Sequence, residues 1–337
     1  MKRRKNIFTK KSRWQVIGEK IAVVFGIVLV VALLGYGIYK GVGWMTWGSK
    51  GKDYSLKPAE ITVLDGTKLN LESALTLESE GKPVKGKVSS VEVGKGLVTS
   101  NKENESSKSD EIEFDGEGEG SIQLTYTLEN GKSVARDLKV KVVKAEDSKD
   151  NQEFITGNGK KMKRENGAFM VDGLPVINNV LKVSETFDPG ESHEAKKAMD
   201  KMIAGAKKEG IHLEIVGGYR NWSQQKSGYE SYFKLVGEKT AERYWAKAGS
   251  GDSQSGQSYD LNYMQPQLID TAAGKWLDQN CYKYGFVIRF PKGEEEMTGF
   301  AYQPWHVRYV GDKLAAKLYN QGAWISIERY LGLPAKQ

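Results

Sequence analysis

The sequence predicts an α+β domain in the C-terminal half of the chain, preceded by an all-β domain and by one transmembrane helix. Three observations predict this order: an uncharged apolar run near the N-terminus, short segments of alternating apolar residues after it, and longer segments with apolar residues at helical spacing towards the C-terminus. A chain of 337 residues is long enough for two domains and a membrane segment. Its 39% hydrophobic and 28% charged residues are typical of a folded protein.

The apolar run, residues 21–39, contains no charged side chain. At about 1.5 Å per residue, a helix of this length matches a hydrocarbon core of about 30 Å. Trp14 precedes the run and Trp44 and Trp47 follow it, where amphipathic rings favour the membrane interface. A cleaved signal peptide is the alternative, but its apolar core is usually only about 7–15 residues long. We therefore expect a single-pass membrane anchor.

The net charge of +7 comes from the N-terminal tail, residues 1–20, which carries eight basic residues against the single Glu19. Basic residues on one side of an apolar run predict a cytoplasmic tail and extracellular C-terminal domains. The remainder of the chain is formally neutral, so a basic surface for nucleic acid is not expected. The single cysteine, Cys281, forms no internal disulfide, and we interpret it as a half-buried helix residue.

Residues 54–144 contain short runs in which apolar residues alternate with polar ones, for example residues 122–126 and 138–142. This period predicts antiparallel strands, and Asn130-Gly131 predicts a hairpin turn. The pattern resembles a bacterial immunoglobulin-like sandwich, which would act as a spacer. Residues 99–119 are expected to form a solvated loop. Residues 145–166 are charged and poor in apolar residues, so an interdomain linker is expected there.

The last domain, residues 167–337, has the pattern of helices on a small antiparallel sheet. Apolar residues at helical spacing predict helices over residues 194–208, 223–235, 241–246 and 271–284. Short apolar runs predict strands over residues 211–216, 286–290 and 305–309.

Four sequence blocks in this domain carry a recognisable order. They are Gly-Gly-Tyr-Arg at residues 217–220, the polar run of residues 249–261, the segment of residues 283–293, and Gln-Pro-Trp-His-Val-Arg-Tyr-Val-Gly at residues 303–311. In this order they resemble the signature blocks of VanY-type D-alanyl-D-alanine carboxypeptidases. The resemblance implies a zinc enzyme that removes the terminal D-amino acid from peptidoglycan stem peptides.

The family motif is Ser-x-His-x-x-Gly-x-x-x-Asp, followed later by Glu-x-x-His. The resemblance implies that Asp260 and His306 are zinc ligands and that Arg220 meets the carboxylate or oxyanion of the substrate. Gly256 matches the motif glycine. In such a site the fourth zinc position holds a water molecule, and the glutamate takes its proton.

Three positions depart from this motif. Ser253 stands where the first histidine ligand belongs, Gln303 where the catalytic glutamate belongs, and Gly251 where the motif serine belongs. A serine hydroxyl is a poor zinc ligand, and Asp260 and His306 alone fall short of three protein ligands. A glutamine amide accepts no proton from water, and loss of a general base typically costs about 10²–10⁴ in rate. We therefore expect zinc to be absent or weakly bound.

Other residues near the motif agree with this interpretation. His193 and His212 lie outside the blocks and are interpreted as surface or packing residues. Spread-out changes favour a natural pseudoenzyme, in which Asp260 and His306 keep a structural hydrogen bond. The further departures are Trp245, Ala248, Gln257 and Ser258. Aromatic residues near the cleft are interpreted as core, or as the lining of a groove for glycan or peptide: Tyr219, Trp222, Tyr229, Tyr232 and Trp245.

Three functions stay open on the sequence alone. The first is a membrane-anchored pseudoenzyme that binds peptidoglycan stem peptides or acts as a scaffold for envelope proteins. The second is an active zinc D,D-carboxypeptidase with an atypical metal site. The third is a structural component of an envelope secretion or transfer complex. Each places the C-terminal domains outside the membrane of a bacterial cell, and the resemblance favours a Gram-positive one.

Overall fold

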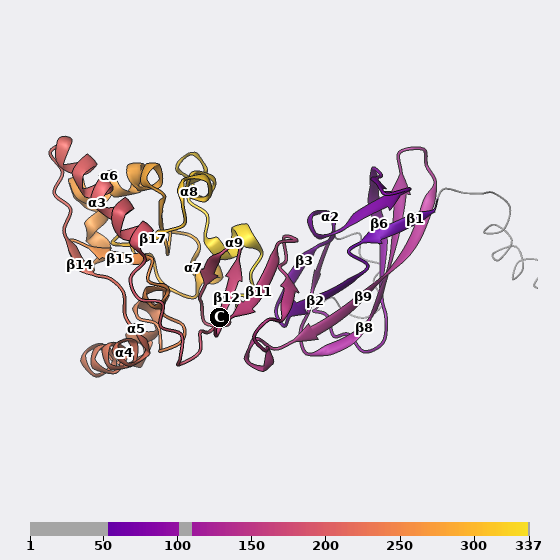
Figure 1. Cartoon of the computed structure of the whole chain (residues 1–337), viewed down its shortest axis with the longest axis horizontal. Coiled ribbons are helices and arrows are strands. Elements are labelled where there is room, and N and C mark those ends of the chain that lie inside the picture. Colours follow the sequence, from indigo (N-terminus) through magenta and orange to yellow (C-terminus); the bar gives the residue numbers. More distant parts are fainter. Residues whose placement is uncertain (1–52, 101–109, 336–337) are drawn as a thin grey trace, which may run out of the picture. The chain divides into compact units, whose positions relative to one another are not determined.

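The computed structural model describes residues 53–100 and 110–335 (Figure 1). Residues from Tyr54 on belong to one compact unit. The predicted tail, residues 1–20, and the predicted membrane helix, residues 21–39, lie outside the described residues. Within the described ranges, every helix is too short or too polar to cross a bilayer.

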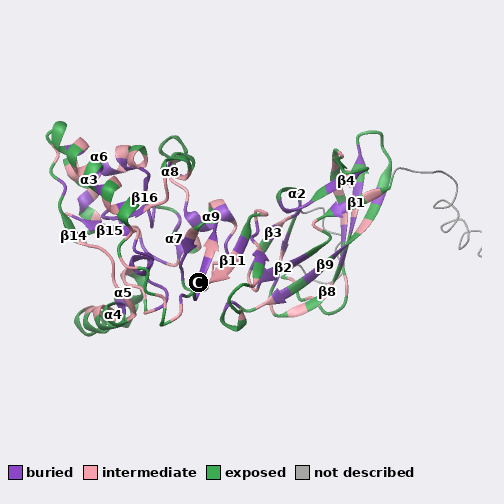
Figure 2. Cartoon of the chain, in the orientation of Figure 1, coloured by how far each residue is buried: buried purple, intermediate pink, exposed green. Residues whose placement is uncertain are grey.

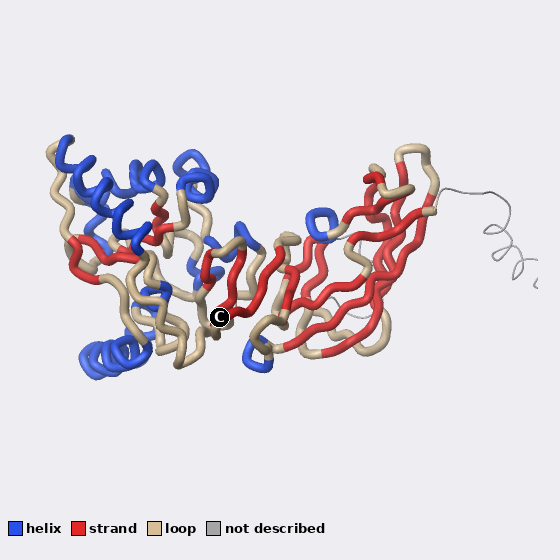
Figure 3. Tube along the Cα trace, in the orientation of Figure 1, coloured by secondary structure: helices blue, strands red, loops and turns tan. Residues whose placement is uncertain are grey.

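The N-terminal part of the described chain is built almost entirely from strands (Figure 3). One sheet has the order β2-β9-β8-β6, and smaller sheets contain β1-β4-β5 and β3-β7. Paired strands run antiparallel, apart from β2 and β9, which are parallel. The elements are β1 Tyr54–Lys57, β2 Glu60–Leu64, β3 Lys68–Asn70, α2 Leu71–Ala74, β4 Thr76–Ser79, β5 Lys82–Pro83, β6 Gly86–Val93, β7 Glu111–Glu113, β8 Gly118–Leu128 and β9 Ser133–Val143.

The longest hairpin of this part joins β8 and β9 across the predicted Asn130-Gly131 turn. Thr127 and Ser133 are the last register partners before the turn, and Gly131 has a φ of 77°, which favours glycine. The alternating side chains of β8 and β9 bury one face in a core that all three sheets share. Residues 110–119, which make up most of the described part of the expected loop, contain β7 and the start of β8. The immunoglobulin-like resemblance stays a prediction.

Residues 145–166 form ordered elements instead of the expected linker. A short 3-10 turn, η1 (Ala145–Asp147), leads into β10 (Glu153–Ile155) and β11 (Lys161–Glu165). These strands pair with β12 (Ala168–Val171) and β13 (Leu174–Val176) in a four-stranded antiparallel sheet. Phe154 and Met162 are buried here in one core with residues of the C-terminal helix α9 (Ile327–Leu331). Because these few buried side chains stand among many charged residues, the composition of the segment predicted a linker where the structure has strands.

The C-terminal domain has a second four-stranded antiparallel sheet in the order β14-β15-β17-β16. Helices α3 and α6 pack against this sheet, and their shared core is buried (Figure 2). The elements are α3 His193–Lys208, β14 Ile215–Gly217, α4 Trp222–Val236, α5 Glu238–Tyr244, η2 Asp252–Ser255, β15 Ser258–Leu261, η3 Pro266–Asp270, α6 Ala272–Asn280, η4 Cys281–Tyr284, β16 Phe286–Ile288, α7 Glu295–Thr298, β17 His306–Tyr309, α8 Asp312–Tyr319, η5 Asn320–Gly322 and α9 Ile327–Leu331. This mixed α/β architecture agrees with the predicted helices on a small sheet.

Candidate functional site

The pairing of β15 with β17 brings Asp260 and His306 together. The two residues are register partners, and both side chains are buried. Nδ1 of His306 lies 2.6 Å from Oδ1 of Asp260. The two residues are 46 positions apart in sequence, and the pairing of neighbouring strands brings them together.

A second carboxylate approaches His306 from its other side. Oδ2 of Asp252, on η2, lies 3.2 Å from Nε2 of His306. Burial opposes the charged imidazolium, but the carboxylates of Asp260 and Asp252 outweigh it and raise the pKa of His306. In its charged form the ring donates one hydrogen bond to each carboxylate.

Asp252 is the centre of a buried ion network. Its Oδ1 accepts hydrogen bonds from Arg289 at 3.0 Å and from Arg308 at 2.7 Å. Arg308 stands two residues after His306 on β17, so both side chains lie on the same face of the sheet. Arg289 also makes a two-pronged contact with Glu328 on α9. Burial favours the neutral acid, but the two arginines hold the pKa of Asp252 well below its usual range.

Arg220 follows β14 and turns towards these carboxylates. Its Nε donates to Oε1 of Gln225 at 3.0 Å, and its Nη2 donates to Oγ of Ser253 at 2.7 Å. Nη1 lies 3.5 Å from Oδ2 of Asp260. The guanidinium also lies over the ring of Trp245, 4.8 Å from its centroid. Arg220 is thus held by three polar partners and one aromatic face.

A small cavity joins these residues. It has a volume of about 40 Å³, which is room for roughly three water molecules. Four of the five predicted site residues line it: Arg220, Ser253, Gln303 and His306. Asp260 does not line the cavity and is buried against His306, which does. Apolar side chains complete the wall: Trp245, Met264, Phe290 and Phe300.

Gln303 lies in the loop before β17. Its side-chain Nε2 donates to the backbone carbonyl of Tyr244 at 3.2 Å, and its backbone N–H donates to Phe290. Its side chain is buried. A neutral amide fixed in this way orients a neighbouring group but takes no proton from water.

Sequence reasoning missed the network behind the site. The motif reading omitted Asp252, Gln225, Arg289, Arg308 and Glu328, although Asp252 lies inside the zinc-binding motif and the two arginines lie inside the last two blocks. The two-residue spacing of His306 and Arg308 on a predicted strand was the available signal. Of the aromatic residues, Trp245 lines the cavity, whereas Trp222 packs in a separate small core and Tyr219 bonds to Asp188.

The residues present do not fit a zinc ion. Two family ligand positions, Asp260 and His306, remain, and both ring nitrogens of His306 face carboxylates. The third position, Ser253, offers a hydroxyl that accepts a hydrogen bond from a cation, Arg220. Among residues 53–100 and 110–335, no three His, Cys, Asp or Glu side chains are arranged to hold a metal ion. His193 and His212 do not line the cavity.

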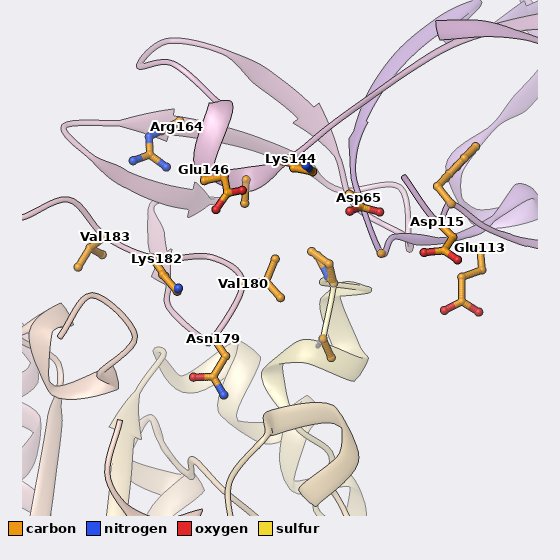
Figure 4. Close-up of a pocket in the computed structure, with 15 residues that line it drawn as sticks. Asp65, Glu113, Asp115, Lys144, Glu146, Arg164, Asn179, Val180, Lys182 and Val183 are labelled. Atoms are coloured by element: carbon orange, nitrogen blue, oxygen red, sulfur yellow. The ribbon is translucent and has the colours of Figure 1, made fainter. Parts of the chain in front are cut away.

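A larger cavity of about 630 Å³ lies elsewhere in the unit (Figure 4). Both acidic and basic side chains line it, among them Asp65 and Asp115 and, elsewhere in the wall, Lys182 and Arg164. None of the predicted site residues lines it. It is therefore distinct from the motif site.

Comparison with known proteins gives one family and several relatives. The VanY family, described as D-alanyl-D-alanine carboxypeptidase, matches residues 190–312. The putative carboxypeptidase YodJ of Bacillus subtilis is 38% identical over 143 residues, which cover 41% of this chain and 52% of that protein. A D-alanyl-D-alanine carboxypeptidase of Enterococcus faecium is 36% identical over 121 residues, which cover 36% of this chain and 37% of that protein. The chain therefore spans about half the length of the first relative and less of the second.

One similar solved structure contains metal. It is a crystal structure of a mutant vancomycin resistance D,D-pentapeptidase VanY, from the VanB-type resistance cassette, in complex with Zn(II). It is 27% identical, with a TM-score of 0.41, and the match covers 47% of this chain and 98% of that chain.

Proposed function

Because residues 190–312 form a domain of the VanY family of D-alanyl-D-alanine carboxypeptidases, we propose that this chain binds the D-alanine end of peptidoglycan stem peptides without hydrolysing it. The carboxypeptidase-like domain supplies the class of ligand. The departures from the motif at Ser253 and Gln303 are the reason why no hydrolysis is expected.

One observation carries the proposal: the side chains at the positions of the third ligand and the base are neutral and already engaged. Ser253 accepts from Arg220, and Gln303 donates to the carbonyl of Tyr244. Without a base to take its proton, a water molecule in the cavity gains little nucleophilicity, and this loss alone typically costs about 10²–10⁴ in rate.

The same cavity retains groups that recognise a terminal D-alanine. A guanidinium has five N–H donors, and three of those of Arg220 are used by Gln225, Ser253 and Asp260, so two are left for a ligand carboxylate. The apolar wall of Trp245 and Phe300 offers contact for a methyl group. The cavity is small, which suits the smallest chiral amino acid.

The test is binding and hydrolysis measured on one sample. The purified chain, with zinc supplied, is titrated with a stem pentapeptide ending in D-Ala-D-Ala in a calorimeter, and the mixture is then analysed by mass spectrometry. We expect saturable binding and no loss of the terminal residue, and weaker binding of a tetrapeptide amide that lacks the free carboxylate. Loss of D-alanine at catalytic rates contradicts the proposal, as does failure to bind.

An active carboxypeptidase is the second candidate. It is favoured by the retained Asp260, His306 and Arg220, which the fold brings together, and by the names of the relatives. The mass spectrum separates the two candidates directly, because only this one predicts a product shorter by one residue.

We further propose that the domain works outside the cell membrane, tethered by residues 21–39. The uncharged run and the basic residues before it support this placement. Two reporters fused after residue 337 test this placement. A reporter that functions only outside the membrane should be active, and activity of a reporter that functions only in the cytoplasm would contradict the placement.

A further inference from the structure

We infer that the guanidinium of Arg220 has taken over the charge-neutralising role that a zinc ion has in this family, so that the site is complete without metal. This inference and the proposed function both rest on the observation that these residues do not fit a zinc ion. It concerns the free protein, however, and is tested without any peptide.

Two groups balance the charge of Asp260. The other buried carboxylates of the network, Asp252 and Glu328, are matched by Arg289 and Arg308, which are themselves buried. Within the described chain, Arg220 is the single Lys or Arg side chain in ion-pair distance of Asp260, and the ring of His306 contacts the other oxygen of this carboxylate. His306 is shared with Asp252, so Arg220 supplies the permanent positive charge at Asp260. Removing such a partner from a buried carboxylate strongly destabilises a protein.

Gln225 holds Arg220 in place. The amide oxygen of Gln225 accepts from its Nε, and the amide nitrogen of Gln225 donates to the carbonyl of Ala246 at 2.6 Å. Gln225 is buried. Its amide group is thus fixed at both ends and turns the guanidinium towards Ser253 and Asp260.

Gly251 stands where the family has a serine. A Cβ at this position would lie 2.6 Å from the amide carbon of Gln225. Because the φ of Gly251 is −79°, backbone strain does not require glycine here, and the space taken by Gln225 does. The departures at positions 251 and 253 thus serve one arrangement: the first makes room for Gln225, and the second accepts from Arg220.

Zinc bound to Asp260 would share this carboxylate with Arg220, whose Nη1 lies 3.5 Å from Oδ2. Two cations on one buried carboxylate repel each other. In this position Arg220 therefore opposes metal binding, and Gln225 and Ser253 hold it there.

The first experiment compares the melting temperature of the wild-type chain with those of Arg220→Met, Arg220→Lys and the control Arg243→Met, in which an exposed arginine is removed. Each is measured with EDTA and with excess zinc. We expect no shift with either addition in the wild type, because nothing in its site takes up zinc. Arg220→Met should melt on the order of 10 °C lower, Arg220→Lys should recover part of this loss, and Arg243→Met should melt as the wild type does.

The inference is overturned if the wild type binds one zinc ion and melts several degrees higher with it. It is also overturned if Arg220→Met has the same melting temperature as the control Arg243→Met. Should Arg220→Met fail to accumulate as folded protein while the control and Arg220→Lys fold, the dependence on a cation at this position is supported in its strongest form.

The second experiment adds back the family residues and measures zinc affinity by calorimetry. Ser253→His supplies a third ligand but leaves Gln225 and Arg220 in place. Ser253→His with Gly251→Ser also displaces the Gln225 amide. We expect the double variant to bind zinc at least about ten-fold more tightly than the single one, since the competing charge is released. Equal affinities contradict the inference.

The two proposals fail separately. If the wild type binds the stem peptide without cleaving it, and Arg220→Met is as stable as the control, the charge replacement is wrong and the proposed function stands. If the Arg220 variants melt as expected but no stem peptide binds, the proposed function is wrong and the charge replacement stands.

Discussion

Asp260 and His306 are register partners on two neighbouring strands, and a hydrogen bond of 2.6 Å joins their side chains. The backbone pairing of β15 with β17 sets this closeness, so it needs no metal ion between the two side chains. This contact is the one that a structural hydrogen-bonded pair requires, and the structural role itself stays a prediction. It also explains how a metal-site pair can persist when its third member is a serine.

The clearest prediction concerns recovery of hydrolysis. Ser253→His with Gln303→Glu should cleave the terminal D-alanine of a stem pentapeptide at least about 10²-fold faster than Ser253→His alone, because the glutamate restores a general base. The measurement is release of D-alanine with zinc supplied. If the wild-type chain already works through an atypical metal site, the double variant should cleave little faster than the wild type. A gain of only a few-fold over an active wild type would contradict the proposed function.

A second prediction concerns Asp252, which the motif reading passed over. Asp252→Asn should lower the free energy of unfolding by about 3–5 kcal/mol, because Arg308 and His306 lose the carboxylate that balances them in a buried site. Urea unfolding followed by circular dichroism measures the change. The matched control is Asp270→Asn, at an exposed position, for which little change is expected. Equal midpoints for the two variants would show that the network contributes nothing to stability.

The elements with strong periodicity could be predicted closely from the sequence. Helix α3 was expected over residues 194–208 and is observed over His193–Lys208, because Met199, Met202 and Ala206 recur at helical spacing and all are buried. The short sheet β10–β13 was missed for the opposite reason. Its strands have three to five residues. The strands β10 and β11 contribute one buried side chain each among charged ones, and β12 and β13 contribute only three and two.

The candidate site divides in the same way. Arg220, Asp260 and His306 could be predicted because fixed spacing in the motif carries them. The contacts of Asp252 with Arg289 and Arg308 could not, because they join residues 37 and 56 positions apart and depend on how η2 packs against β17. A sequence shows which side chains are charged, but only the fold shows which charges share a buried space.

Cys281 supports a third prediction. Its side chain is fully buried instead of half-buried, and burial, with Asp278 nearby, raises the pKa of its thiol. A thiol reagent should therefore react at least about 10³-fold more slowly with the native chain than with the chain in denaturant. Because the chain has one cysteine, the absorbance of the released reagent measures this site alone. Ser231→Cys in a Cys281→Ala background is the exposed control, and an equally fast reaction of native Cys281 would contradict the packing described.

The last prediction concerns the segment that was expected to be a linker. Gly157 donates its N–H to the carbonyl of Gly332 at 2.7 Å and accepts from the N–H of Asn70 at 2.8 Å, so it joins the β-rich part to the C-terminal end. A Cβ on Gly157 would lie 2.2 Å from the carbonyl oxygen of Lys68, which is backbone and cannot swing away. Gly157→Ala should therefore destabilise the protein by about 1–3 kcal/mol.

Differential scanning calorimetry measures the effect of Gly157→Ala. Gly218→Ala is its control, because the nearest atom to a Cβ there lies at an ordinary 3.7 Å. A flexible linker would tolerate both substitutions equally. A lower melting temperature for Gly157→Ala alone would support a close-packed junction, since only a backbone held against Lys68 and Gly332 has no room for one methyl group.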